Sequence, residues 1–123
     1  MAPVSAKPSF AAIYRWRLRP GAEEQFRTGW ERRTRELVER GGGLGSCLHR
    51  CEDGTLVAYA RWPDRQTWSA AMELDPIDHE ARALVLSAVE EQLPSFFMEI
   101  VADLLAGLAF PGTGPGNGTS IEL

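Results

Sequence analysis

Tyr14, His49 and Tyr59 are the side chains of this 123-residue chain best suited to proton transfer. His49 has an unperturbed pKa close to neutrality, which makes it the natural candidate for a general base. Arg15 and Arg61 could stabilise an anion, because a guanidinium stays charged and its N–H groups fork across two oxygens. These residue types predict a pocket in which a bound compound loses a proton and the resulting negative charge is stabilised.

The candidate side chains also have structural interpretations. Trp62, like other large aromatics, could pack in the core. His49 could be a hydrogen-bonded histidine of a sheet, as buried polar groups usually are. Arg15 could form an ion pair with Glu99 or Asp103 on a neighbouring strand. The residue types alone leave both interpretations open.

Cys47 and Cys51 are the only cysteines. On one strand, four residues apart, their Cα atoms would lie about 13 Å from each other, whereas a disulfide needs less than about 7 Å. We therefore expect two small, partly buried thiols and no disulfide. With His49 between them they lack the second ligand cluster typical of zinc sites, so no metal site is expected.

The segment Phe10 to Leu18 has the period of a strand and carries the first candidates. Tyr14 and Trp16 fall on one face, whereas Arg15 and Arg17 fall on the other, because side chains alternate along a strand. Neither face has the plain polar character of a solvated surface. The pattern therefore predicts a strand that is covered on both sides.

A helix is predicted from Ala22 to Arg40, ended by the glycines at 41–43. Spacings of three and four define its inward stripe: Ala22, Phe26, Trp30, Arg33 and Leu37. Three pairs at i,i+4 are expected to mark its solvent side: Glu23 with Arg27, Glu31 with Arg35, and Glu36 with Arg40.

A hairpin is predicted over residues 44–62, because Asp53-Gly54 between two strand-like runs is typical of a two-residue type I′ turn. His49 and Trp62 then share a face of the sheet. The register that follows from this turn pairs His49 with Ala58, Leu48 with Tyr59, and Cys47 with Ala60.

Two helical segments and a strand are predicted beyond the hairpin. Asp64 is placed to cap the first helix, and Asp75-Pro76 interrupts it, since the residue before a proline avoids the helical region. The second helix is predicted over residues 77–92, with the next proline as its end. Residues 95–103 are apolar on both faces and predict a final strand inside the sheet or covered by a partner.

The order of these elements, βαββαβ, is the split βαβ arrangement of ferredoxin-like α+β domains. Such a domain has an antiparallel sheet of order 4-1-3-2 with its helices on one face. The other face would be a large exposed apolar patch, which monomers seldom tolerate, so we expect a homodimer through the open sheet face. The domain is assigned to residues 9–105, between a flexible tail at 1–8 and a Gly/Pro-rich tail at 106–123.

Three stretches carry a family resemblance: IYRWRLRPGAEEQFRTGW, LGSCLHRCEDGTLVAYARWPDRQTW and FFMEIVADLL. They resemble the antibiotic biosynthesis monooxygenase superfamily of dimeric α+β barrels, over residues 9–105. That superfamily includes cofactor-free monooxygenases of aromatic polyketides, haem-degrading enzymes, quinol oxidases, and members without an assigned activity. The resemblance implies a homodimer with a binding site inside the barrel.

The haem-degrading branch fits the sequence poorly. That branch has an Asn in the first strand, a Trp at the end of the third and a His on the helices that follow. Trp62 matches the second position, but Tyr14 occupies the first and Ala81 the third, with His79 two residues earlier. Haem degradation is therefore not expected.

The polyketide-oxidising branch uses Trp, Tyr, Arg and Asn side chains around an aromatic substrate that itself reduces oxygen. The resemblance thus implies a cofactor-independent monooxygenase for a small aromatic, polyketide-like or quinol substrate. A non-catalytic small-molecule-binding or regulatory domain on the same fold is the alternative. With the proton-transfer argument for His49, the candidates are Trp62, Tyr14 and His49 as catalytic residues and Arg15, Tyr59 and Arg61 as substrate-binding residues.

Charge and hydropathy limit the partners. The net charge is -4, and the basic cluster at 32–40 is interleaved with glutamates, so no nucleic acid partner is expected. No apolar window approaches the roughly 20 residues of a membrane span. The first residues lack the apolar run of a signal peptide, so a cytoplasmic protein without a membrane partner is expected.

Overall fold

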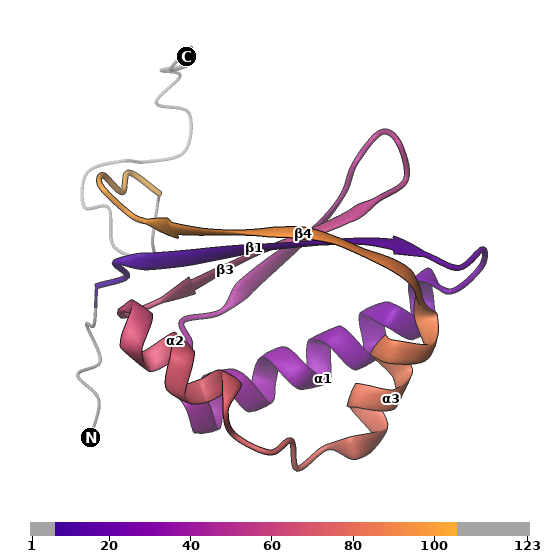
Figure 1. The fold of residues 1–123 in the computed structure, drawn as a ribbon, viewed down its shortest axis with the longest axis horizontal. Helices are drawn as coiled ribbons and strands as arrows, with labels where there is room; N and C mark the ends of the chain where they lie inside the picture. Colours follow the sequence, from indigo (N-terminus) through magenta and orange to yellow (C-terminus); the bar gives the residue numbers. More distant parts are fainter. Residues whose placement is uncertain (1–6, 106–123) are drawn as a thin grey trace, which may run out of the picture.

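The structure, a computed structural model, describes residues 7–105. The tail predicted at 106–123 lies outside this range, as does most of the tail predicted at 1–8. Figure 1 shows two layers, a sheet and a layer of helices that covers one of its faces. The elements are β1 (Phe10–Leu18), α1 (Glu23–Gly41), β2 (Ser46–Arg50), β3 (Leu56–Trp62), α2 (Arg65–Met72), α3 (His79–Ala88) and β4 (Val89–Glu99).

The sheet has the predicted ferredoxin-like topology. Its strand order is β2-β3-β1-β4, which is 4-1-3-2 counted from the other edge, and every neighbouring pair is antiparallel. β1 lies in the interior, between β3 and β4. We call the face that meets the helices the inner face and the opposite face the outer face.

The two faces of β1 have different surroundings. Its aromatic face is the inner one: Trp16 is 9% exposed, and its ring lies 4.9 Å from that of Phe26 on α1. Arg15 and Arg17 belong to the outer face, which has no helix over it (Figure 1). The expectation that both faces are covered therefore holds within this chain only for the inner face.

The helix ends follow the local signals in the sequence. α1 ends at the predicted glycines, where Gly42 has a φ of 79° and is therefore in the left-handed region that glycine adopts without strain. Asp64 caps α2, because its Oδ1 accepts the Thr67 backbone N–H at 2.7 Å. No helix of residues 7–105 is long and apolar enough to cross a membrane.

The predicted hairpin register is wrong by one residue. The Cys51 N–H donates to the Thr55 carbonyl at 2.8 Å, so three residues form the loop, and Gly54 takes the left-handed position with a φ of 87°. His49 pairs with Val57. A shift of one residue turns every side chain of a strand to the other face. His49 is therefore on the outer face, opposite Trp62. Both cysteines are free, and they are exposed rather than partly buried.

The boundaries predicted around Pro94 are also wrong. α3 ends at Ala88, and β4 runs from Val89 to Glu99 with Pro94 inside it. The strand tolerates this proline because β4 is an edge strand. Ile13 pairs with Phe96 but Arg15 pairs with Leu93, which leaves an extra residue in β4 at the proline. This β-bulge accommodates the missing N–H.

Candidate functional site

A cavity of about 250 Å³ lies between the inner face of the sheet and the helices. We call it the sheet–helix cavity. It lies on the helix-covered face of the sheet, whereas the binding site was expected inside a dimeric barrel, on the open face. Small-molecule sites usually start at roughly 300 Å³, so this volume suits a small ligand. Most of its wall is apolar, and its aromatic lining consists of Tyr14, Trp16, Phe26, Trp30 and Trp62.

Residue size along two strands explains why a hollow exists here. β3 carries Ala58 and Ala60 on the inner face, and these small side chains leave room between the bulky residues around them. β1 places Tyr14 beside Ala58, because the two residues are paired across the strands. Trp62 is the last residue of β3 and also lines the cavity.

Tyr14 has a hydroxyl group that is held by a neighbouring indole. Trp68 Nε1 donates to the Tyr14 hydroxyl oxygen at 2.8 Å. Burial raises the pKa of Tyr14 above its usual range, although the Trp68 hydrogen bond and the charge of Arg33 act in the opposite direction. Tyr14 is therefore a neutral phenol at pH 7, and its O–H remains free to donate to a ligand.

Trp62 is 3% exposed, and its Nε1 has no acceptor among the described residues. A buried donor left unpaired costs about 1 to 3 kcal/mol, so such groups usually have a partner. The ring can take this position because Gly43 lies against it: a Cβ on Gly43 would lie 3.2 Å from the indole. Trp62 thus lines the cavity with an indole whose unpaired N–H is itself fully buried, so a ligand reaches this donor only after the wall of the cavity shifts.

Arg33 lines the cavity from α1, and the sequence analysis did not single it out as a site residue. Its nearest carboxylate oxygen is Glu36 Oε2, at 3.5 Å from Arg33 Nη1. The signal was present in the sequence, since Arg33 is the one charged residue in the otherwise apolar stripe of the helix. A charged residue at an inward position needs a partner, which is a reason to examine it as a ligand contact.

The six candidate residues do not gather at one place. Tyr14 and Trp62 line the cavity, whereas the other four belong to the outer face and do not line it: Arg15, His49, Tyr59 and Arg61. Arg61 forms an ion pair with Asp103. The ion pair considered for Arg15 is not formed, because its guanidinium lies over the Phe96 ring, 5.8 Å from the centroid.

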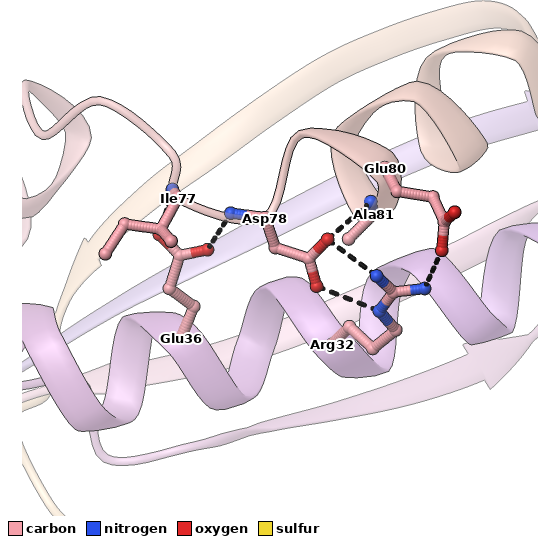
Figure 2. A network of polar contacts seen from close by, with 6 residues as sticks. All are labelled: Arg32, Glu36, Ile77, Asp78, Glu80 and Ala81. Atoms are coloured by element: carbon pink, nitrogen blue, oxygen red, sulfur yellow. Dashed lines mark hydrogen bonds and ion pairs between the residues drawn. The ribbon is translucent and has the colours of Figure 1, made fainter.

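Glu36 joins α1 to the connection between α2 and α3, as Figure 2 shows. It was expected on the solvent side but is only 9% exposed. Its carboxylate accepts the backbone N–H groups of Ile77 at 3.0 Å and Asp78 at 3.2 Å. The bond from Ile77 is the main cause of the lowered pKa of Glu36. Arg32 adds a second link through Asp78 and Glu80 (Figure 2).

No group of three or more His, Cys, Asp or Glu side chains within residues 7–105 could hold a metal ion. The polar groups at the cavity are hydroxyl, amide, indole and guanidinium groups: Tyr14, Arg33, Thr34, Ser46, Trp62 and Gln92. These groups can bind an organic ligand through hydrogen bonds.

The solved structures that share this fold include the following three. SnoaB from Streptomyces nogalater, a cofactor-independent oxygenase, is 16% identical with a TM-score of 0.65, over 81% of this chain and 100% of its own. The ActVA-Orf6 monooxygenase of Streptomyces coelicolor, in complex with nanaomycin D, is 21% identical with a TM-score of 0.63. The match covers 81% of this chain and 94% of ActVA-Orf6. A provisionally assigned antibiotic biosynthesis monooxygenase of Bordetella bronchiseptica is 21% identical with a TM-score of 0.64, over 78% and 100%.

These likenesses confirm the fold that the sequence resemblance predicted, the α+β fold of antibiotic biosynthesis monooxygenase structures. No protein-family model matches the chain, and no curated protein matches it. The fold is therefore shared at low sequence identity, and the chemistry has to be argued from the cavity of this chain.

Proposed function

We propose that this chain is a cofactor-independent monooxygenase that oxidises a small aromatic, polyketide-like or quinol compound in the sheet–helix cavity. The observation that carries the proposal is an aromatic-walled cavity lined by Tyr14, whose hydroxyl is neutral, and by Trp62, whose indole N–H is unpaired and fully buried. Two proteins of the same fold, SnoaB and ActVA-Orf6, are oxygenases.

The proposed reaction uses the substrate itself as reductant. An ionised phenol or enol transfers an electron to oxygen, a C–O bond forms, and the O–O bond then breaks. In a substrate with a reactive CH₂ group, one oxygen atom becomes a carbonyl, and the other leaves as water with the two hydrogens. Tyr14 and Trp62 would donate hydrogen bonds to the oxygens that become negative, and donors fixed in advance stabilise such charge strongly.

Oxygen uptake tests this proposal. The wild type should consume one oxygen molecule per molecule of a hydroxyanthrone, or should oxidise a quinol. Trp62→Phe and Tyr14→Phe should each lower kcat by about tenfold or more, because each removes a donor. Thr28→Ala, which removes an exposed hydroxyl on α1, is the control and should keep the wild-type rate.

Two results would reject the enzyme. One is oxygen uptake by the wild type that does not exceed the rate without protein. The other is an unchanged rate in both Trp62→Phe and Tyr14→Phe. Saturable binding of the same aromatic compounds without turnover would then support the alternative, a non-catalytic binding or regulatory domain.

We also propose that the protein is a homodimer through the outer face. Phe96 is 52% exposed there, beside half-buried apolar side chains of the neighbouring strands. In the dimer, the outer-face candidates Arg15, His49, Tyr59 and Arg61 would lie at or near the interface. The cytoplasmic location expected from the sequence stays a prediction.

A further inference from the structure

Arg33 has a more distant carboxylate partner than three other arginines of α1. Arg32, Arg35 and Arg40 each place a guanidinium nitrogen 2.6 to 2.8 Å from a carboxylate oxygen. Arg33 lies 3.5 Å from the Glu36 carboxylate, and no hydrogen bond from its guanidinium is formed within residues 7–105. Its side chain is only 26% exposed, so water does not fully replace the missing partner.

Glu36 is already occupied by other donors. It accepts from Arg40 Nη1 at 2.7 Å and from the backbone N–H groups of Ile77 and Asp78 (Figure 2). These bonds fasten the α2–α3 connection, so the carboxylate cannot turn toward Arg33 without breaking them. Its single negative charge is shared between two arginines, and Arg33 keeps much of its positive charge available.

Arg33 is also the single charged side chain that lines the cavity in the described part of the chain. It belongs to the helix layer, whereas Trp62, with its unpaired N–H, belongs to the sheet. The Trp62 N–H is itself fully buried, so Arg33 is the group that brings charge to this small, apolar cavity. A ligand with negatively charged oxygens would give the Arg33 guanidinium a closer partner than Glu36.

We infer that the sheet–helix cavity selects an aromatic compound with one negative charge, whose anionic oxygens bind the Arg33 guanidinium. The inference rests on the proposed function for the aromatic nature of the ligand. The charge preference comes from Arg33 alone, because a guanidinium forms forked, charge-assisted hydrogen bonds that a neutral ligand cannot match.

Calorimetric titration with 2-naphthoate and 2-naphthamide at pH 7 tests the charge preference, because these probes have the same rings and differ in charge. The wild type should bind the anion about tenfold or more tightly than the amide, as expected for a hydrogen bond between charged groups. Arg33→Gln should remove this preference while keeping the affinity for the amide. Arg33→Lys should retain part of it, and Arg35→Gln, on the exposed side of α1, should behave like the wild type.

Equal affinity of the wild type for the two probes, or binding of neither, would overturn the inference. So would a preference that survives in Arg33→Gln, or in Arg33→Met if the glutamine variant does not fold. Oxygen uptake separates this inference from the proposed function. Selective binding of 2-naphthoate without turnover of any hydroxyanthrone or quinol would reject the oxygenase and leave the anion site standing. Turnover of a hydroxyanthrone or quinol without a preference for 2-naphthoate would support the oxygenase and reject the anion site.

Discussion

Two indoles near the cavity, the partly buried Trp68 and the buried Trp62, have opposite hydrogen-bonding states. Trp68 donates to the Tyr14 hydroxyl, whereas Trp62 has no acceptor within residues 7–105. The first bond orients a phenol that stays protonated, whereas the second indole N–H is both unpaired and fully buried. A site that already contains fixed donors does not need to reorganise when charge develops, which is what an anionic reaction intermediate requires.

Glu36 provides a test at the scale of one residue. Glu36→Gln should lower the free energy of unfolding by about 1 to 2 kcal/mol at pH 7, because it weakens charge-assisted bonds at a buried position. Hydrogen bonds, first of all that from Ile77, lower the folded-state pKa of Glu36. The stabilisation is therefore complete above the unfolded pKa of about 4.3 and is lost as the pH falls through the folded value.

Urea unfolding between pH 3 and pH 7 measures this effect as a difference between wild type and Glu36→Gln that shrinks toward zero in acid. Glu39→Gln is the matched control, because Glu39 is exposed on the same helix. A difference for Glu36→Gln that is constant over the whole pH range would contradict the role assigned to its charge.

At the scale of elements, Gly29 sets the distance between α1 and α3. A Cβ at this position would lie 2.7 Å from the Ala81 carbonyl oxygen and 2.9 Å from both Leu84 Cβ and Val85 Cγ2. Val85 also lines the cavity, so the close helix contact helps to define its wall. Gly29 lies within a continuous helix and has ordinary helical backbone geometry. Glycine is therefore required here by the space between the two helices and not by its backbone conformation.

Gly29→Ala should therefore destabilise the protein by about 1 to 3 kcal/mol through overpacking. Helix propensity acts in the opposite direction, because alanine is favoured over glycine by about 1 kcal/mol in a helix interior. Chemical denaturation would show which effect dominates. Thr28→Ala changes the exposed neighbouring position and should be neutral or slightly stabilising. A gain in stability for Gly29→Ala would show that the two helices move apart easily.

Local signals predicted the end of α1, the start of α2 and the topology, but they could not determine two alignments. Asp64 acts through its own side chain on the first turn of α2, and Gly42 acts through its own backbone, so their roles can be seen in the sequence. Asp53-Gly54 is compatible with a two-residue or a three-residue loop, and the choice depends on packing of Leu48 and Leu56 against the helices. Pro94 resembled a helix terminator because its position at a sheet edge depends on the whole fold.

The same limit applies to the candidate site. Tyr14 and Trp62 could be predicted as cavity residues from strand alternation and family resemblance, and the structure brings them together. The one-residue register shift placed His49 on the other face. Spacing did distinguish Arg33, because it is the one charged residue in the apolar stripe of the helix. Its distance from the surrounding carboxylates, which leaves it loosely paired, could not be foreseen from the sequence.

At the scale of the whole molecule, the outer face leads to the prediction of a dimer. Light scattering of the wild type should give twice the chain mass of 13.6 kDa. Phe96→Glu should give the monomer mass, because it replaces a half-exposed apolar side chain of the proposed interface with a charge that would have to be buried. Leu86→Glu changes a similarly exposed apolar residue on α3, away from the outer face, and should leave the dimer intact. A wild type of 13.6 kDa would refute the dimer.

The position of β1 between β3 and β4 has a consequence for the order of folding. β1 lies near the start of the chain and its partner β4 about 80 residues later, so the interior strand keeps one side unpaired until β4 has been synthesised. Contacts between distant segments slow folding, because the chain must close a long loop before it gains their energy. On the ribosome, a nascent chain that ends at Ala88 would expose the open edge of β1, and chaperone binding to such stalled chains should stop once β4 has emerged.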